Sequence, residues 1–178
     1  MKYTLDTEFY EKPGSIEMIS IGIVAEDGRE YYAESALFDW RLCDPSGPFT
    51  QNSTQKWLWK NVRPHVLPID YRKLPSQIGI EILAFVSEPN RRKQPVDRPE
   101  FWGYFADYDW VVFCWLYGSM IDLPKRYPMY CRDLKQVMDA NHIARSDLPQ
   151  QDKQHKAIDD AHWNMKVLRE FMAKGLIS

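Results

Sequence analysis

The first 34 residues constrain the fold most, because they read as three consecutive strands joined by two tight turns. Residues 15–25 alternate isoleucine with other side chains, which indicates a strand whose two faces are both at least partly covered. Pro13-Gly14 turns the chain before this strand, and Asp27-Gly28 after it is a strong hairpin signal. We therefore predict a three-stranded antiparallel meander over residues 2–34.

The middle of the chain is less regular. Residues 51–62 favour a short helix, and a second helix begins at Pro75, where proline is tolerated in a first turn. Apolar residues at helical spacing continue this helix until Pro89-Asn90 stops it. Residues 91–95 then form a basic loop bounded by proline, which we interpret either as a solvated connection or as a rim that steers phosphates.

The last third of the chain contains short strands followed by helices. Residues 101–106 predict a buried strand that leads into an apolar helix over residues 110–117, and residues 128–132 predict another short strand. From Ala157 onward, apolar residues recur every three or four positions, as in a helix that packs one stripe on a sheet. This order predicts a single α/β domain over residues 1–178. Its mixed central sheet combines the antiparallel meander with parallel strands and is flanked by helices.

Composition limits where and how the protein acts. The formal charge of −2 argues against broad electrostatic binding of nucleic acid, but it does not exclude an enzyme that holds only a strand end. The three cysteines lack a Cys-x-x-Cys spacing, so a disulfide framework or a zinc site is not expected. Without a signal-like N-terminus or an apolar run of membrane-spanning length, we expect a cytoplasmic protein with no membrane partner.

Asp6 and Glu8 are two residues apart in the first strand, so their side chains point to the same face. Adjacent carboxylates raise each other's pKa unless a cation or a proton lies between them. Mg²⁺ and Mn²⁺ are the natural occupants of such an all-oxygen site. The alternative is an edge strand whose polar face simply meets water.

Asp107 and Asp109 follow the predicted strand 101–106, at the strand end where α/β folds build their sites. Either acid can belong to the same site, and the alternative is that they cap the helix that follows.

His155 and Asp160 precede and open the last helix. Five residues apart, they cannot face one site from the body of a single helix, but they can if His155 stands on the preceding loop. A histidine there suits a general base, because its pKa lies near neutral pH. The alternative for His155 alone is an ordinary surface histidine.

Taken in order, these motifs resemble the three exonuclease motifs of the DEDDh group in the RNase H-like, DnaQ-type superfamily. The motifs are Asp6-x-Glu8, Tyr108-Asp109 and His155-x-x-x-x-Asp160. Residues 6–9, 16–22 and 26–33 look more narrowly like the polyadenylate-specific 3′-to-5′ exoribonucleases known from mycobacteria.

The resemblance implies an RNase H-like fold and two divalent ions, Mg²⁺ or Mn²⁺. It implies metal ligation by Asp6, Glu8, Asp109 and Asp160, with His155 as the general base. Phe105-Ala106-Asp107 stands where relatives often have His-Asn-Ala, so Asp107 remains a rival to Asp109. The expected substrate is the 3′ end of single-stranded RNA, shortened one nucleotide at a time, and a homodimer is expected by analogy.

Two side chains near the acids are candidates for contact with terminal bases. Phe9 and Met18 could wedge or stack against them, although Phe9 stands where many relatives have threonine. Three other functions remain open: a 3′-5′ exonuclease acting on DNA or short oligonucleotides, a non-catalytic nucleic-acid-binding module of the same fold, and a phosphatase for small esters.

Overall fold

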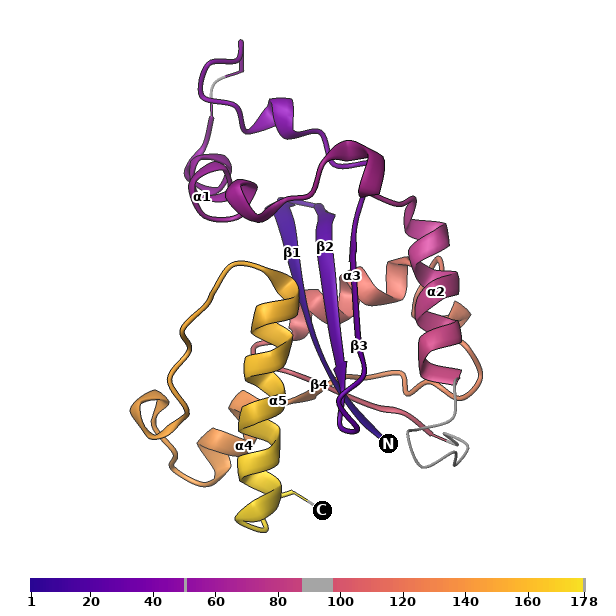
Figure 1. Ribbon diagram of the computed structural model, residues 1–178, viewed down its shortest axis with the longest axis vertical. Helices are drawn as coiled ribbons and strands as arrows, with labels where there is room; N and C mark the ends of the chain where they lie inside the picture. The colour runs from indigo at the N-terminus through magenta and orange to yellow at the C-terminus, as the bar shows by residue number, and fades with distance from the viewer. Residues whose placement is uncertain (50, 88–97, 178) are drawn as a thin grey trace.

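A computed structural model describes residues 1–49, 51–87 and 98–177 of the chain. Its strands form one five-stranded sheet in the order β3-β2-β1-β4-β5, in which β1 pairs antiparallel with β2 and parallel with β4 (Figure 1). The strands are β1 (Lys2–Lys12), β2 (Ser15–Ala25), β3 (Glu30–Glu34), β4 (Glu100–Gly103) and β5 (Arg132–Asp133). The α-helices are α1 (Ser53–Asn61), α2 (Pro75–Ser87), α3 (Asp107–Trp115), α4 (Leu134–Ala140) and α5 (Ala157–Ala173).

The predicted meander over residues 2–34 is confirmed. Gly14 and Gly28 adopt φ angles of 80° and 87° in the two turns, a region that glycine enters without the steric cost of a Cβ atom. A β-bulge between Glu8 and Phe9 shifts the pairing of β1 with β2 by one residue. The bulge decides which β2 side chains lie beside the acids of β1.

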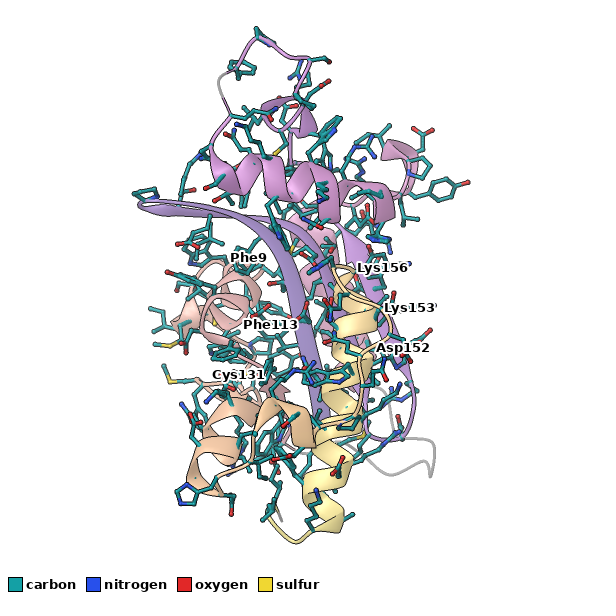
Figure 2. All side chains as sticks on the ribbon, turned by 90° about the vertical axis from the view of Figure 1, so that its left-hand side faces the viewer. Phe9, Phe113, Cys131, Asp152, Lys153 and Lys156 are labelled. Atoms are coloured by element: carbon teal, nitrogen blue, oxygen red, sulfur yellow. The ribbon has the colours of Figure 1, made fainter. Side chains whose placement is uncertain are left out.

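Helices cover both faces of the sheet. Helices α2 and α3 pack on one face, through Ile78, Ile82 and Phe113 against Leu5 and Ile21. Helices α4 and α5 cover the other face and bury Val24 and Trp102 of the sheet together with Leu134, Leu168 and Phe171. Figure 2 shows the result: Phe9, Phe113 and Cys131 lie on one side of β1, and Lys156 lies on the other.

Helix α1 packs at the far end of β1 and β2, beyond the acids (Figure 1). It confirms the helix predicted within residues 51–62. Asn52 and Gln55 form a capping box that satisfies backbone N–H groups at its start. Leu58 and Val62 join Tyr10 and Ile19 in a third apolar cluster, so the segment after β3 is anchored to the ends of the two longest strands.

The predicted bounds around α3 were less accurate. Strand β4 ends at Gly103 rather than at residue 106, because Asp133 accepts hydrogen bonds from the N–H groups of Phe105 and Ala106 and draws the chain out of the sheet. Helix α3 therefore begins at Asp107, three residues earlier than predicted, and the strand expected at 128–132 is reduced to Arg132–Asp133.

The predicted basic loop at 91–95 and the stop at Pro89-Asn90 lie outside the described residues. Among the residues that the structure describes, no helix combines the length and the apolar character that crossing a bilayer requires.

Candidate active site

Strand β1 presents Asp6 and Glu8 to the face that α5 covers. Side chains along β1 alternate between the two faces of the sheet. Thr4 Oγ1 donates to the Ala161 carbonyl of α5 at 2.8 Å, whereas Leu5 belongs to the core on the α2 and α3 side. The alternation predicted from the sequence therefore holds, and both carboxylates point toward the start of α5.

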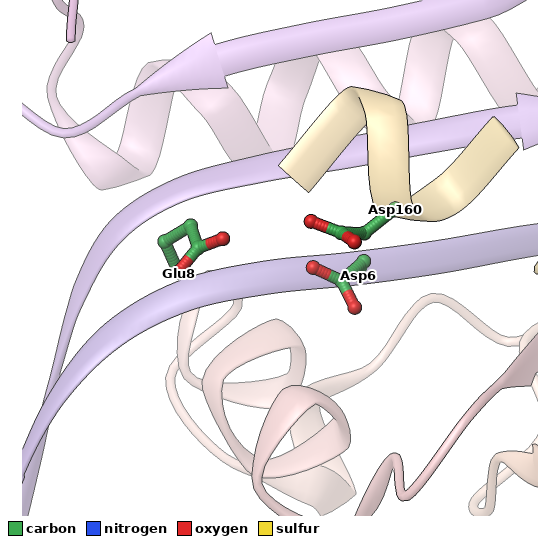
Figure 3. Close-up of side chains that lie close together, drawn as sticks. All are labelled: Asp6, Glu8 and Asp160. Atoms are coloured by element: carbon green, nitrogen blue, oxygen red, sulfur yellow. The ribbon is translucent and has the colours of Figure 1, made fainter. Parts of the chain in front are cut away.

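Helix α5 brings Asp160 to these two acids because its first turn lies directly on the sheet. Asp6 pairs with Gly22 on β2, and a Cβ atom at Gly22 would lie 2.5 Å from backbone atoms of both Ala157 and Ile158. The bare glycine thus lets the helix approach. As Figure 3 shows, Asp160 then reaches Asp6 and Glu8, and one carboxylate oxygen from each of the three lies within 4.8 Å of the others.

Burial and mutual repulsion raise the pKa values of these carboxyl groups, so that they do not readily ionise together. Burial raises the pKa of Asp6 well above its ordinary value, and the charges of Asp109, Asp160 and Glu8 raise it further. Burial, with Asp160 and Asp109, raises the pKa of Glu8 to about 8. The site therefore concentrates negative charge in a place where only a proton or a bound cation can relieve it.

Asp109 lies at the edge of this cluster, in the first turn of α3. Its Oδ1 accepts two hydrogen bonds of 2.7 Å, from the backbone N–H and the hydroxyl of Thr7. Burial raises the pKa of Asp109 to about 6, and the bonds from Thr7 oppose that rise. Asp109 is near enough to raise the pKa of Asp6, although it stands outside the close group of three carboxylates.

Asp107 is placed differently from its rival. Its side chain is exposed, whereas only 7% of Asp109 is exposed. The predicted alternative that Asp109 caps the helix is wrong, because its carboxylate is bonded to Thr7 of β1 and the residue at the N-cap position is Ala106.

His155 stands on the loop before α5, as the five-residue spacing requires. Its backbone has a φ angle of 65°, and its ring meets the ring of Trp57 edge to face, with 4.8 Å between centroids. Burial raises the pKa of Asp160, and the charge of His155 opposes this rise. The structure thus brings His155 into electrostatic reach of the cluster and seats its ring against α1.

A model of the 3′-5′ exoribonuclease Rv2179c-like domain matches residues 1–172. The chain belongs to this family. Two relatives from Mycobacterium tuberculosis are 3′-5′ exoribonuclease Rv2179c of strain H37Rv and 3′-5′ exoribonuclease MT2234.1 of strain CDC 1551. Each is 35% identical over an alignment of 179 positions, which covers 95% of this chain and 92% of the relative.

Solved structures agree with the Rv2179c-like assignment at the level of the fold. Pop2p of S. pombe, in a form with Mg²⁺ and Mn²⁺ bound, superposes with a TM-score of 0.55 at 12% identity, over 97% of this chain and 83% of that one. Exonuclease I of Methylocaldum szegediense gives 0.60 at 11% identity, over 98% of this chain and 41% of that one. The predicted RNase H-like fold and the predicted exonuclease family are confirmed.

The two residues predicted to contact bases lie on the α3 side of this Rv2179c-like domain. Phe9 and Met18 pair across β1 and β2, next to the bulge. The ring of Phe9 lies 5.8 Å from that of Tyr108, and Met18 lines an apolar groove with Trp115 of α3. Both are half-buried and sit just past Glu8 along the sheet.

Sequence reasoning missed three residues that build the site. Gly22 seats α5, Thr7 holds Asp109, and Gln151 donates a hydrogen bond from Nε2 to Asp160 Oδ1. Gly22 and Thr7 lie within the predicted strands, but their roles depend on contacts between the sheet and helices α5 and α3. Gln151 precedes α5 in a polar loop, where composition gave no signal.

Proposed function

We propose that this Rv2179c-like protein is a metal-dependent exonuclease that removes nucleotides one at a time from the 3′ end of single-stranded RNA. The observation that supports it most is the convergence of Asp6, Glu8 and Asp160, drawn from β1 and α5, within 4.8 Å. The activity named for the Mycobacterium tuberculosis relatives supports the direction of cleavage and the choice of RNA.

The donor set fits two divalent ions, Mg²⁺ or Mn²⁺. Every candidate ligand is a carboxylate oxygen, the donor that these hard cations prefer. Asp6, Glu8 and Asp160 would hold one ion, and Asp109, through its second oxygen, would complete the site for the other. When bound, such a pair lowers the pKa of a water nucleophile and stabilises charge on the leaving oxygen.

The chain's own groups would then position the substrate and move the proton. His155 is proposed as the general base, and its loop position lets the imidazole approach a water next to Asp160. Asp109 is preferred to Asp107 because it is buried, fixed by Thr7 and electrostatically linked to Asp6. Phe9 and Met18 are proposed to contact the terminal bases.

A labelled single-stranded RNA tests this proposal. With the label at its 5′ end and Mn²⁺ present, we expect a ladder of products that shorten from the 3′ end, and no products when the metal is chelated. The matched DNA strand should be degraded more slowly. Faster degradation of DNA would overturn the RNA assignment.

Two neighbouring acids of α5 provide a matched pair of variants. Asp160→Asn should abolish the ladder because it removes a charged ligand from the cluster, whereas Asp159→Asn changes the same helix turn and should retain activity. Equal rates in the two variants would contradict the role proposed for the carboxylate cluster.

A further inference from the structure

A hollow lies far from the acids, where β4 and β5 begin. It has a volume of about 590 Å³, and four cationic residues line it: Arg98, Lys125, Arg126 and Arg132. Figure 1 shows the start of β1 beside β4 at the end of the sheet remote from α1, and Lys2 pairs there with Glu100. The hollow thus lies at the opposite end of β1 from Glu8.

The charge of this hollow is opposite to that of the whole protein. The formal charge of the chain is −2, yet Glu100 is the one carboxylate among the described residues that line the hollow. Arg132 reaches Glu100 at 3.4 Å, but both side chains are partly exposed and such a pair is weak. Lys125 and Arg126 are exposed and have no ion-pair partner within residues 1–49, 51–87 and 98–177. The hollow is therefore suited to an anion.

Aromatic side chains beside the cations indicate which class of anion the hollow binds. The guanidinium of Arg132 lies 5.6 Å from the ring centre of Tyr130 and 5.5 Å from that of Trp102. Trp102 is buried, whereas Tyr130 lines the hollow and is 56% exposed, so Tyr130 is the ring of the two that a ligand can reach. Grooves that bind single-stranded nucleic acid combine two features. Their cations contact the phosphates, and their aromatic rings and guanidinium planes stack on the bases. An acidic peptide would use the cations but would not need the exposed ring of Tyr130.

We propose that this hollow binds the RNA upstream of its 3′ end, as a second contact that holds long substrates. The identity of the ligand rests on the proposed function. From Lys2 to Glu8 a strand extends about 20 Å, at ~3.3 Å per residue. A stacked strand at about 3.4 Å per nucleotide covers that distance in roughly six nucleotides. RNA shorter than this cannot occupy both places.

Charge reversal at the hollow tests the proposal. In Lys125→Glu/Arg126→Glu, KM for an RNA several times longer than this span should rise about tenfold, with kcat unchanged, because two phosphate contacts are lost. The salt dependence of binding should also flatten, by about 1.4 in the slope of log K against log salt. Kinetics on a tetranucleotide should not change. An unchanged KM for the long RNA, or an equal loss on the tetranucleotide, would overturn the proposal.

The control variant Lys166→Glu/Lys174→Glu makes the same change in net charge at two exposed positions, one in α5 and one directly after it. It should retain the wild-type KM, and thermal melting should show that both double variants fold. If the wild type cleaves no RNA, the proposed function fails, but binding of the long RNA by fluorescence anisotropy without metal still tests the hollow. Equal affinity of the two double variants would refute RNA binding there.

Discussion

Gly22→Ala is the substitution that tests most sharply how the fold assembles its acids. The new Cβ would lie 2.5 Å from the carbonyl carbon and oxygen of Ala157 and from the Cα of Ile158. Ordinary contacts between carbon atoms are about 3.5–4.0 Å, so roughly 1 Å of movement is required. All three obstructing atoms belong to the backbone, so the first turn of α5 has to move as a unit.

That movement carries Asp160 away from Asp6 and Glu8. Overpacking of this kind costs about 1–3 kcal/mol in the free energy of unfolding. A displacement of about 1 Å at a catalytic group lowers the rate by roughly 10²-fold. We therefore expect a modest fall in melting temperature but a large fall in kcat.

Initial rates of RNA hydrolysis at saturating Mn²⁺, together with thermal melting, measure both effects. Gly79→Ala is the matched control, because its Cβ would meet the Leu116 carbonyl oxygen at 2.9 Å on the opposite face of the sheet. That variant also brings a new Cβ too close to a backbone atom, although less severely, and it should retain kcat because the acids lie on the other face. Wild-type kcat in Gly22→Ala, or equal losses in both variants, would show that the close approach of α5 to Gly22 does not position Asp160.

Three further predictions concern the acids and the histidine. The pKa of Glu8 is raised to about 8 and that of Asp109 to about 6, so the folded protein holds these protons more tightly than the unfolded chain does. The stability that these two acids contribute to the metal-free protein should therefore be complete near pH 4 and should be lost as the pH rises from about 5 to about 8, by on the order of a few kcal/mol. Mn²⁺ should reverse the loss. Melting temperatures that rise between pH 5 and pH 8 without metal would contradict this. His155→Ala should lower kcat far more than Mn²⁺ affinity measured by calorimetry, and equal losses would argue against its role as base. Asp109→Asn should impair hydrolysis much more than Asp107→Asn in the same rate assay, and the reverse order would make Asp107 the third acid.

The sequence predicted the parts of the site that depend on local periodicity. Asp6 and Glu8 share a face because strand side chains alternate, and the alternation is visible in the residues themselves. The spacing of His155 and Asp160 required a loop residue followed by a helix residue, and the structure has that arrangement. Both inferences needed only the geometry of a single element.

The contacts between elements could not be predicted in the same way. If β1 and β2 paired regularly from the turn at Pro13-Gly14, without a bulge, Asp6 would lie opposite Ile21. A side chain of that size would keep α5 off the sheet. The bulge after Glu8 moves the partner to Gly22. A one-residue shift exchanges the faces of a strand, and nothing in the local composition marks where it occurs.

The strand that precedes Asp109 shows a similar limit. Residues 101–106 are apolar enough to continue as a strand, but Asp133, far along the chain, binds two of their N–H groups and ends β4 early. This interaction sets where α3 starts and so brings Asp109 within reach of Thr7. Tertiary hydrogen bonds overrode the local preference, and local sequence does not reveal them.

Anomalous scattering from crystals soaked with Mn²⁺ and a mononucleotide would show whether the carboxylate cluster binds the metal ions. We expect ions bound by Asp6, Glu8 and Asp160, with Asp109 completing the second position and the 3′ end of the nucleotide next to them. Peaks elsewhere on the molecule, with this cluster left without metal under conditions where the enzyme hydrolyses RNA, would contradict it.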